Sequence, residues 1–538
     1  MLGRGRCRKS VRECYHGRTI IVGQMLFNSY QFIFVFLPVA LIGYEIAGWF
    51  HRKAVIAWLG FVSLAFYAYW RPALLLVLVS SIGLNYLAGA LISRRIPNRV
   101  NARVWLTLAI VLDLAVLCWF KYLFPSLNFL SSALGSSRHW TDVVLPLGIS
   151  FFTFTQISFL VDLYQGIAKQ QDLNSYVLFV TFFPHLIAGP ILHHKEMMPQ
   201  FQQDRRYRLN PQDLAVGLSW FIMGLCKKVL LADTFGRGAN PIFDADRLSA
   251  GDAWMGALFY TLQLYFDFSG YSDMALGLAR MFSINFPLNF NSPYKAASII
   301  DFWQRWHMTL SNYIMAYLYT PVQQWARKRR QNAGKGVSRK DVTAPGAFAG
   351  MIAFPMMFSM FVAGVWHGAG FQFVVFGSLH GFYLTINHAW RLFRHKRTPG
   401  PPSHFFVRTG RHVCSVLLTF VCVLVGFVFF RARSAAFAVK MLAAMFGISS
   451  SPALHSSDLL PRAAAIPIGL AICWFLPNTQ QILSRFKPSL QESAWRTEAV
   501  PRGFLWSPNM GWAVTIGALF FIMLFKIQEP STFLYFQF

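Results

Sequence analysis

Long apolar segments alternate with short polar segments along almost the whole of this 538-residue chain. A helix needs about 20 apolar residues to cross the hydrocarbon core of a bilayer, and many of these segments reach or approach that length. The pattern therefore predicts about twelve membrane crossings, each of them an α-helix. They cover residues 30–50, 54–70, 72–92, 104–120, 143–164, 212–233, 252–281, 348–366, 370–390, 412–430, 461–477 and 511–527.

Two further apolar stretches, near 176–192 and 299–322, are interrupted by Pro, His, Arg and Trp. Such residues suit an irregular backbone that is buried inside the protein better than a helix that faces lipid. We therefore expect re-entrant or interfacial pieces at both places.

Composition supports a membrane protein. Hydrophobic residues make up 55% of the chain and charged residues 13%, whereas soluble proteins carry about 25% charged residues. So few charged side chains could not cover a soluble core of this size. The expected fold class is an all-α polytopic membrane protein, with the lipid bilayer as its surroundings.

The net charge is +28, from 49 Lys and Arg against 21 Asp and Glu. The basic residues lie in short runs between apolar segments, such as Arg327–Arg330. A nucleic-acid-binding protein would instead need a basic and mostly polar domain, so no nucleic-acid partner is expected. Basic loops are retained on the cytoplasmic face, and the runs between crossings share that face if both ends of the membrane domain lie outside.

Residues 1–24 disagree with this orientation, because they carry several Arg and Lys and a single acid, Glu13. We expect translation to begin at Met25, which leaves residues 1–24 as a basic extension and residues 25–538 as the membrane domain. The alternative is a genuine basic tail on a protein of opposite orientation. Residues 531–538 form an aromatic tail after the last crossing.

Seven cysteines are scattered along the chain, most of them inside apolar segments and none in a C-x-x-C pair. This usage predicts neither a disulfide framework nor a metal site. The Gly-rich phosphate-binding motifs of nucleotide-binding proteins are absent as well. We therefore expect no tightly bound cofactor.

Polar residues at membrane depth are costly, and they usually face a cavity or a partner. The first cluster runs from Phe182 to Pro190 and is followed by His193 and His194. Its two prolines and its glycine would break a spanning helix, which favours a re-entrant loop over a cavity. The alternative is a structural bend in which the backbone satisfies His185.

A second cluster contains Asp267 and Asp273 in one apolar helix. Their separation of about 240° around the helix axis excludes a shared face and hence a paired acid and base. We expect these carboxylates to orient a cationic neighbour or to cap a helix break near Gly270.

A third cluster, Asp301–Ser311, packs Trp303, Arg305, Trp306 and His307 into a few residues. An interfacial helix with a Trp anchor is the simplest explanation of it.

A fourth cluster is Trp366-His367-Gly368, between two strongly apolar helices. A lone intramembrane His more often makes a helix–helix hydrogen bond than it acts as a catalyst.

The four motifs together, in this order and at this spacing, resemble the membrane-bound O-acyltransferase (MBOAT) superfamily from about Met25 to Phe538. The likeness is greatest to the bacterial branch with alginate O-acetyltransferase and the teichoic-acid D-alanylation enzyme. The resemblance implies a helical bundle around a central tunnel, with His367 as principal catalytic residue and His307 as its partner. Its further candidates, for lining the tunnel or contacting the substrate, are Trp303, Arg305, Trp306, Trp366, His185, Asp267 and Asp273.

The implied chemistry is acyl transfer from a thioester to a hydroxyl, for which a buried neutral imidazole is a suitable general base. The implied function is O-acetylation of an alginate- or cellulose-type exopolysaccharide at the bacterial inner membrane. The chain has no acyl-carrier or nucleotide-binding motif of its own, so the acetyl donor must come from outside. Acetyl-coenzyme A is the simplest such donor. Alternatives are a D-alanyl or lipid O-acyltransferase of the same family, and, from another class, a transporter.

The tail also resembles the C-terminal tyrosine motif of the small accessory protein of the D-alanylation system. Tyr535 is therefore a candidate acyl relay to a periplasmic SGNH-hydrolase-like acetyltransferase, which would act with the polysaccharide synthesis machinery. The alternative is that the tail seals the helix bundle by aromatic packing.

Overall fold

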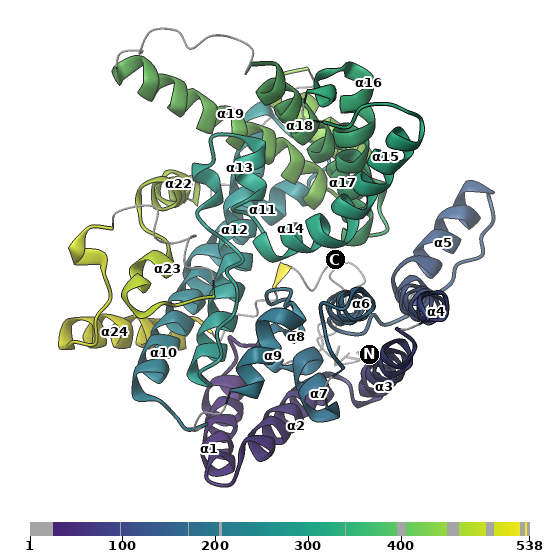
Figure 1. Ribbon diagram of the computed structural model, residues 1–538. Coiled ribbons are helices and arrows are strands. Elements are labelled where there is room, and N and C mark those ends of the chain that lie inside the picture. Colours follow the sequence, from purple (N-terminus) through teal and green to yellow (C-terminus); the bar gives the residue numbers. More distant parts are fainter. Residues whose placement is uncertain are drawn as a thin grey trace, which may run out of the picture.

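The computed structural model describes residues 25–96, 98–141, 143–170, 172–203, 207–338, 340–394, 405–448, 462–490, 500–527 and 533–534. Regular structure within these ranges is helical throughout, with no strand (Figure 1). Figure 1 shows α1–α3 at one end of the molecule and α15–α19 at the other, with α12 and α14 between them.

The first half of the chain contains, in order, η1 (Phe32–Phe36), α1 (Leu37–Gly48), α2 (Arg52–Trp70), α3 (Pro72–Arg95), α4 (Arg99–Cys118), η2 (Trp119–Leu123), α5 (Phe124–Ala133), α6 (Ile149–Gln165), α7 (Leu173–Thr181), α8 (Phe183–Leu186), α9 (His194–Gln202), α10 (Pro211–Cys226), η3 (Lys227–Ala232), α11 (Asp233–Asp244) and α12 (Ala250–Met281). The second half contains η4 (Pro293–Lys295), α13 (Ile299–Trp303), α14 (Met308–Ile314), η5 (Met315–Tyr319), α15 (Thr320–Asn332), η6 (Asp341–Thr343), α16 (Pro345–Phe348), η7 (Ala349–Ala353), α17 (Phe354–His367), α18 (Phe371–Arg394), α19 (Phe405–Arg431), α20 (Ala435–Met445), α22 (Ala465–Phe475), α23 (Thr479–Ile482), η8 (Ser484–Phe486), η10 (Arg502–Phe504) and α24 (Met510–Lys526).

The local sequence explains where several helices begin. The ring of His51 accepts the N–H of Ala54 at the start of α2, and the hydroxyl of Ser249 accepts the N–H of Asp252 at the start of α12. Both bonds satisfy a backbone donor that has no partner within its helix. Pro72 begins α3, where the missing N–H of proline costs nothing.

Six continuous helical runs are long and apolar enough to cross a membrane, within the described ranges: Arg52–Trp70, Pro72–Arg95, Arg99–Ala133, Pro211–Asp244, Pro345–His367 and Phe406–Arg431. Shorter apolar helices cover Phe32–Gly48, Ala435–Met445, Ala465–Phe475 and Met510–Lys526. Every crossing expected from the sequence overlaps a helix, and the chain is a multi-pass membrane protein. Its number of crossings stays a prediction.

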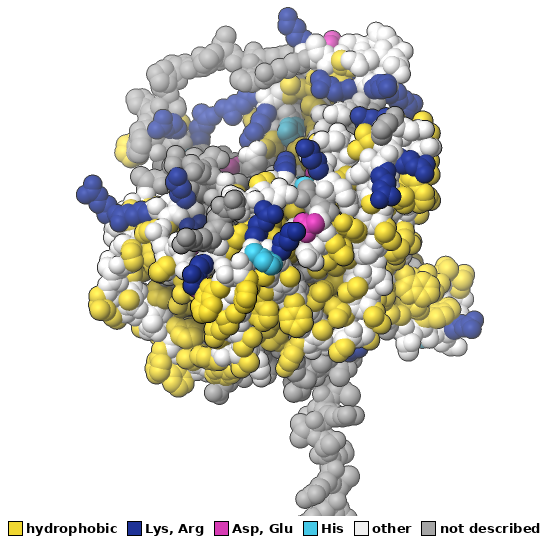
Figure 2. All heavy atoms as spheres, turned by 60° about the horizontal axis from the view of Figure 1, so that its bottom comes forward, with side chains coloured by type: hydrophobic (Ala, Val, Ile, Leu, Met, Phe, Trp, Pro, Cys, Tyr) yellow, Lys and Arg dark blue, Asp and Glu magenta, His cyan; other side chains and the backbone are white. Residues whose placement is uncertain are grey.

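The outer surface suits a bilayer. Figure 2 shows one face of the molecule on which hydrophobic side chains form a broad continuous area, with Lys and Arg side chains along its border. Leu76, Val100 and Phe406 are among the large apolar side chains at least 70% exposed. Exposed apolar surface of this extent is what lipid tails cover, and the basic border matches the place of headgroups.

The central helix is α12, in which every residue from Phe259 to Ala279 is buried. It packs closely on α10, since a Cβ on Gly224 would lie 2.7 Å from the carbonyl oxygen of Gly270. Small residues at such a contact let two helix backbones approach each other. The helix continues through Gly270 without interruption, so the alternative in which the aspartates cap a helix break there is wrong. Gly270 serves close packing instead.

Both interrupted apolar stretches have the irregular backbone that the sequence predicts, whereas their re-entrant or interfacial placement stays a prediction. In the first, α8 is a single turn and residues 187–193 are not helical. In the second, α13 ends at Trp303 and α14 begins at Met308. The second interruption presents His307 to the interior of the protein.

Candidate active site

His307 lies between α13 and α14 in a left-handed backbone conformation, with φ of 42°. This conformation is unfavourable for a residue with a side chain, so the surroundings must hold it in place. Asn289 does so twice, because its carbonyl oxygen accepts the N–H of Met308 at 2.9 Å and its Oδ1 lies 2.9 Å from Nδ1 of His307. Oδ1 of Asn289 also accepts the hydroxyl of Thr309.

This arrangement sets the roles of the two nitrogens of His307. Oδ1 of Asn289 is an acceptor, so Nδ1 of the imidazole carries the hydrogen and Nε2 is the acceptor. Nε2 is buried without a hydrogen-bond partner among the described residues. His307 therefore offers one unused lone pair.

His367 is the last residue of α17, and two groups from η2 hold the helix end next to it. Lys121 donates from Nζ to the carbonyl oxygen of Trp366 at 2.5 Å. The hydroxyl of Tyr122 donates to the carbonyl oxygen of Val365 at 2.9 Å. The imidazole of His367 packs edge-on against Phe430, with ring centroids 4.9 Å apart. It is 8% exposed and makes no hydrogen bond to the part of the chain that the structure describes.

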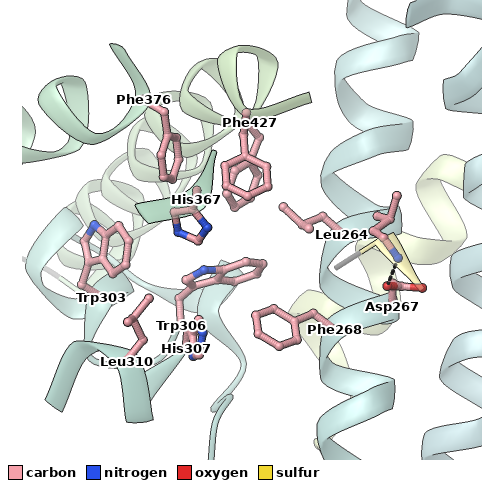
Figure 3. A pocket seen from close by; sticks show the side chains of 12 residues that line it. Leu264, Asp267, Phe268, Trp303, Trp306, His307, Leu310, His367, Phe376 and Phe427 are labelled. Carbon is pink, nitrogen blue, oxygen red and sulfur yellow. Dashed lines mark hydrogen bonds between the residues drawn. The ribbon is translucent and has the colours of Figure 1, made fainter. Parts of the chain in front are cut away.

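Both histidines line one small cavity of about 30 Å³. Figure 3 shows the indole of Trp306 between the two imidazoles in that view, with Trp303 and Phe268 to either side. The full lining is Leu264, Asp267, Phe268, Trp303, Trp306, His307, Leu310, His367, Phe376, Phe427, Phe430 and Leu534. Rings and aliphatic side chains dominate it, so the cavity is apolar apart from the histidines and one carboxylate.

His367 also lines a second cavity, of about 90 Å³. Its other lining residues are Lys121, Leu145, Pro146, Leu147, Gly148, Ile149, Ser150, Phe151 and Ile187. His367 is thus the one residue common to both linings.

Asp267 connects the first cavity with the end of the chain. Its Oδ2 accepts the N–H of Leu534 at 3.0 Å (Figure 3), and its Oδ1 pairs with Nζ of Lys228 at 2.8 Å. Lys228 pairs equally with Asp233 at 2.8 Å and lies 4.8 Å from the ring centroid of Phe533. Residues 533–534 are therefore buried against a charged network, and Tyr535 lies outside the described residues.

Asp273 lies on the same helix and lines neither of these cavities. Its carboxylate pairs with Lys227 at 2.5 Å and accepts hydrogen bonds from Thr479 at 2.7 Å and Trp220 at 3.1 Å. These contacts join α12 to α10, η3 and α23. Each of the two aspartates thus holds a lysine, which the sequence predicted as one of two alternatives.

Three other candidates lie outside both linings. His185 is buried with Nε2 3.0 Å from the carbonyl oxygen of Phe179, which matches the alternative of a bend satisfied by the backbone. Arg305 pairs with Asp301 at 2.8 Å. The indole of Trp366 stacks on Phe154 with centroids 5.2 Å apart, and this contact orients the residue that precedes His367.

Three residues of the site were not singled out from the sequence. Lys121 and the fully buried His380 are ionisable groups in or next to expected crossings, a signal that could have found them. His380 accepts at Nδ1 from the indole of Trp303 at 3.3 Å and so positions one wall of the first cavity. Asn289 lies in a loop with no such signal.

The described residues contain no group of three His, Cys, Asp or Glu that could hold a metal ion. What the site does offer is two imidazoles with nitrogens that have no hydrogen-bond partner among the described residues. In an apolar cavity, such groups can accept a proton and orient a hydroxyl.

Comparison with known proteins identifies the family. The membrane-bound O-acyltransferase family model matches residues 158–335, which include His307. The peptidoglycan O-acetyltransferase of Helicobacter pylori is 35% identical over 96% of this chain and 98% of its own length. The probable alginate O-acetylase AlgI of Pseudomonas putida is 34% identical over 96% of this chain and all of its own. The teichoic acid D-alanyltransferase of Streptococcus thermophilus is 30% identical, over 47% of this chain and 58% of its own. This multi-pass membrane protein is an acyltransferase and belongs to the membrane-bound O-acyltransferase family.

Proposed function

We propose that this enzyme moves an acetyl group from a thioester to a hydroxyl, as the membrane step in O-acetylation of an exported polysaccharide. The observation that carries the proposal is the cavity that the buried His367 shares with His307, whose Nε2 has no hydrogen-bond partner among the described residues. The two relatives similar over almost the whole chain are named as O-acetylating enzymes, and these names support acetyl as the group transferred.

The proposed step is a direct acyl transfer. The hydroxyl oxygen attacks the carbonyl carbon of the thioester, a C–O bond forms, and the C–S bond breaks. His367 takes the proton from the attacking hydroxyl at a ring nitrogen and passes it to the leaving thiolate, which departs as a thiol. No other group needs to change its protonation.

His307 orients the acceptor in this scheme. Its ring is fixed by Asn289, and its Nε2 can accept a hydrogen bond from a hydroxyl that enters the cavity. The surrounding rings of Trp303, Trp306 and Phe268 exclude water, which would otherwise hydrolyse the thioester.

Tyr535 is the hydroxyl that we propose as the first acceptor. Leu534, which precedes it in the chain, lines the cavity of both histidines and is bound through its N–H to Asp267. An aryl ester has a better leaving group than an alkyl ester, so onward transfer to a serine is favourable. The proposed recipient is an SGNH-hydrolase-like acetyltransferase in the periplasm, which then acetylates the polymer.

The proposed donor is acetyl-coenzyme A, and the proposed location is the inner membrane of a bacterium. The basic segments between the crossings would attract the phosphates of the donor from the cytoplasm. The polymer is an exported polysaccharide, whose sugar hydroxyls are the final acceptors.

The test is His367→Ala, expected to lower polymer acetylation by about 10²–10⁴-fold, the usual effect of removing a general base. Acetyl ester released from the exopolysaccharide and peptidoglycan fractions is the measured quantity, with membrane insertion checked by blotting. His185→Gln is the matched control, since His185 is equally buried but lines neither of the two cavities. Near wild-type acetylation by a normally inserted His367→Ala protein would overturn the proposal.

Transfer of a D-alanyl group is the second candidate, because the family includes a teichoic acid D-alanyltransferase. That relative matches less than half of this chain, whereas the O-acetylating relatives match almost all of it. A transporter, the alternative from a different class, is set aside because the chain is an acyltransferase.

A further inference from the structure

The 90 Å³ cavity next to His367 contains polar groups that the proposed step does not use. Lys121 enters it from η2, and the first residues of α6 form part of its wall. No carboxylate occurs among its described lining residues. The cavity therefore combines the candidate base with an uncompensated positive charge.

Lys121 retains hydrogen-bonding capacity for a ligand. An ammonium group has three N–H donors, and among the described residues Nζ has one hydrogen-bond acceptor, the carbonyl oxygen of Trp366. The same Nζ lies 5.7 Å from the indole centroid of Trp366. Two N–H groups are left for a molecule in the cavity.

The N-terminus of α6 adds to this positive potential. Gly148 caps this 17-residue helix with φ of 68° and without a side-chain hydrogen bond, and a Cβ there would lie 2.4 Å from the carbonyl oxygen of Leu186. The N–H of Ile149 bonds to Pro146, and those of Phe151 and Phe152 bond to Gly148. The N–H of Ser150 has no backbone acceptor in the described ranges. Helix N-termini stabilise negative charge on a neighbouring oxygen.

His367 supplies the independent sign that the cavity takes a ligand. Its imidazole is more than nine-tenths buried, lines the cavity and makes no hydrogen bond to the described residues. Buried polar groups in proteins are nearly always hydrogen-bonded, so a ligand is the expected partner here.

From this arrangement we infer that the cavity is the acyl-group pocket, in which Lys121 and the N-terminus of α6 bind the carbonyl oxygen and select a neutral acyl group over a cationic aminoacyl group. The inference rests on the proposed function. The cavity of about 90 Å³ exceeds the roughly 10–15 Å³ that one water needs, so it has room for a small group such as acetyl. A D-alanyl group is larger and brings an ammonium close to Lys121. The oxygen that gains negative charge during the attack then faces the positive groups.

The charge selection can be measured with three thioesters of one small thiol, N-acetylcysteamine, carrying acetyl, D-lactyl or D-alanyl groups. D-lactyl and D-alanyl differ by a hydroxyl against an ammonium and are otherwise of the same shape. Two positive charges about 6 Å apart at an effective dielectric constant of about 20 disfavour binding by about 100-fold. We expect the wild-type enzyme in lipid nanodiscs to transfer acetyl fastest and to use D-lactyl about 100-fold better than D-alanyl. Acyl mass on the enzyme and release of free thiol are the two readouts.

Lys121→Met tests the residue itself. It should lower acetyl transfer by about 10²-fold or more, as expected for loss of an oxyanion donor, and reduce the lactyl-to-alanyl ratio by at least about tenfold. Lys121→Arg keeps the charge and should keep that ratio even if its rate falls. Tyr122→Phe is the matched control, because Tyr122 supports the same helix end through an uncharged bond and should leave the ratio unchanged.

The outcomes separate this inference from the proposed function. Acetyl transfer with equal use of D-lactyl and D-alanyl thioesters would overturn the pocket and leave the acetyltransferase standing. D-alanyl as the fastest substrate would overturn both. An unchanged lactyl-to-alanyl ratio in a Lys121→Met protein that thermal unfolding shows to be folded would overturn the role of Lys121 in selecting the acyl group.

Discussion

Asp267→Asn should release residues 533–534 from the interior without dismantling the membrane domain. The carboxylate gives one oxygen to Nζ of Lys228 at 2.8 Å and the other to the N–H of Leu534 at 3.0 Å. An amide has one acceptor oxygen and one donor nitrogen, so the variant must place its NH₂ against one of these two donors. One of the two contacts is therefore lost whichever way the amide turns.

The free energy lost in the Asp267→Asn protein can be worked out from the two groups that bind the Asp267 carboxylate. A hydrogen bond to a charged group contributes about 1.5–3 kcal/mol, and an unsatisfied buried donor costs about 1–3 kcal/mol. Lys228 keeps its bond to Asp233, so it is not left unpaired, and the loss stays below the 3–5 kcal/mol expected for a broken buried ion pair. A weakening of about 2 kcal/mol corresponds to an approximately 30-fold rise in the undocked population of the segment.

Hydrogen exchange at the amide of Leu534 reports this population directly, because that amide is the donor to Asp267. In the Asp267→Asn protein its exchange should be about 30-fold faster, with acetylation reduced in parallel. Asp273→Asn is the control: it weakens an ion pair of the same helix but touches neither residue 533 nor residue 534. Equal exchange at Leu534 in the wild-type and Asp267→Asn proteins would refute the docking role.

Four further outcomes are expected. Asn289→Ala should lower kcat about tenfold or more with little change in KM, because His307 loses its orienting bond; an unchanged kcat would show that the orientation of His307 is immaterial. Tyr535→Phe should insert normally yet fail to acetylate the polymer, and wild-type enzyme lacking its partner should carry an acetyl mass on the C-terminal peptide; wild-type acetylation by the variant would make Tyr535 a packing residue. Gly368→Ala places a Cβ 2.3 Å from a ring of α18, so its thermal unfolding temperature should fall by an amount equivalent to about 1–3 kcal/mol, and an unaltered temperature would contradict this. Deletion of residues 1–24 should leave complementation intact, whereas loss of function would show that the extension is required.

Much of the fold could be predicted from the sequence because a bilayer demands long apolar helices. The interruptions near Pro184 and His307 could be anticipated as well, since Pro, Gly and charged groups do not suit a lipid-facing helix. The helix α20 was missed because a helix of 11 residues, one of them Lys440, is too short to cross a bilayer. The expected break at Gly270 failed because glycine has two uses, a backbone bend and close helix packing, and the local sequence does not distinguish them.

The two histidines of the candidate site could be singled out from the sequence, but the residues that hold them could not. The left-handed conformation of His307 depends on Asn289, 18 positions earlier, and nothing in the local sequence indicates it. The same is true of the lysines next to Asp267 and Asp273, which come from a different helical segment. Partners across a tertiary contact are set by packing, whereas motif spacing reports only neighbours along one element.

The bond between Asp267 and Leu534 also sets an order of events during biosynthesis. The two residues are 267 positions apart, so a ribosome adding about 5–20 residues per second needs about 13–53 s to pass from one to the other. During that interval Lys228, which pairs with both Asp233 and Asp267, compensates the carboxylate inside the membrane domain. The wall of the cavity to which Leu534 contributes can close only after residue 534 has been made. The cavity that holds both histidines is therefore completed by a segment synthesised long after the helices around it.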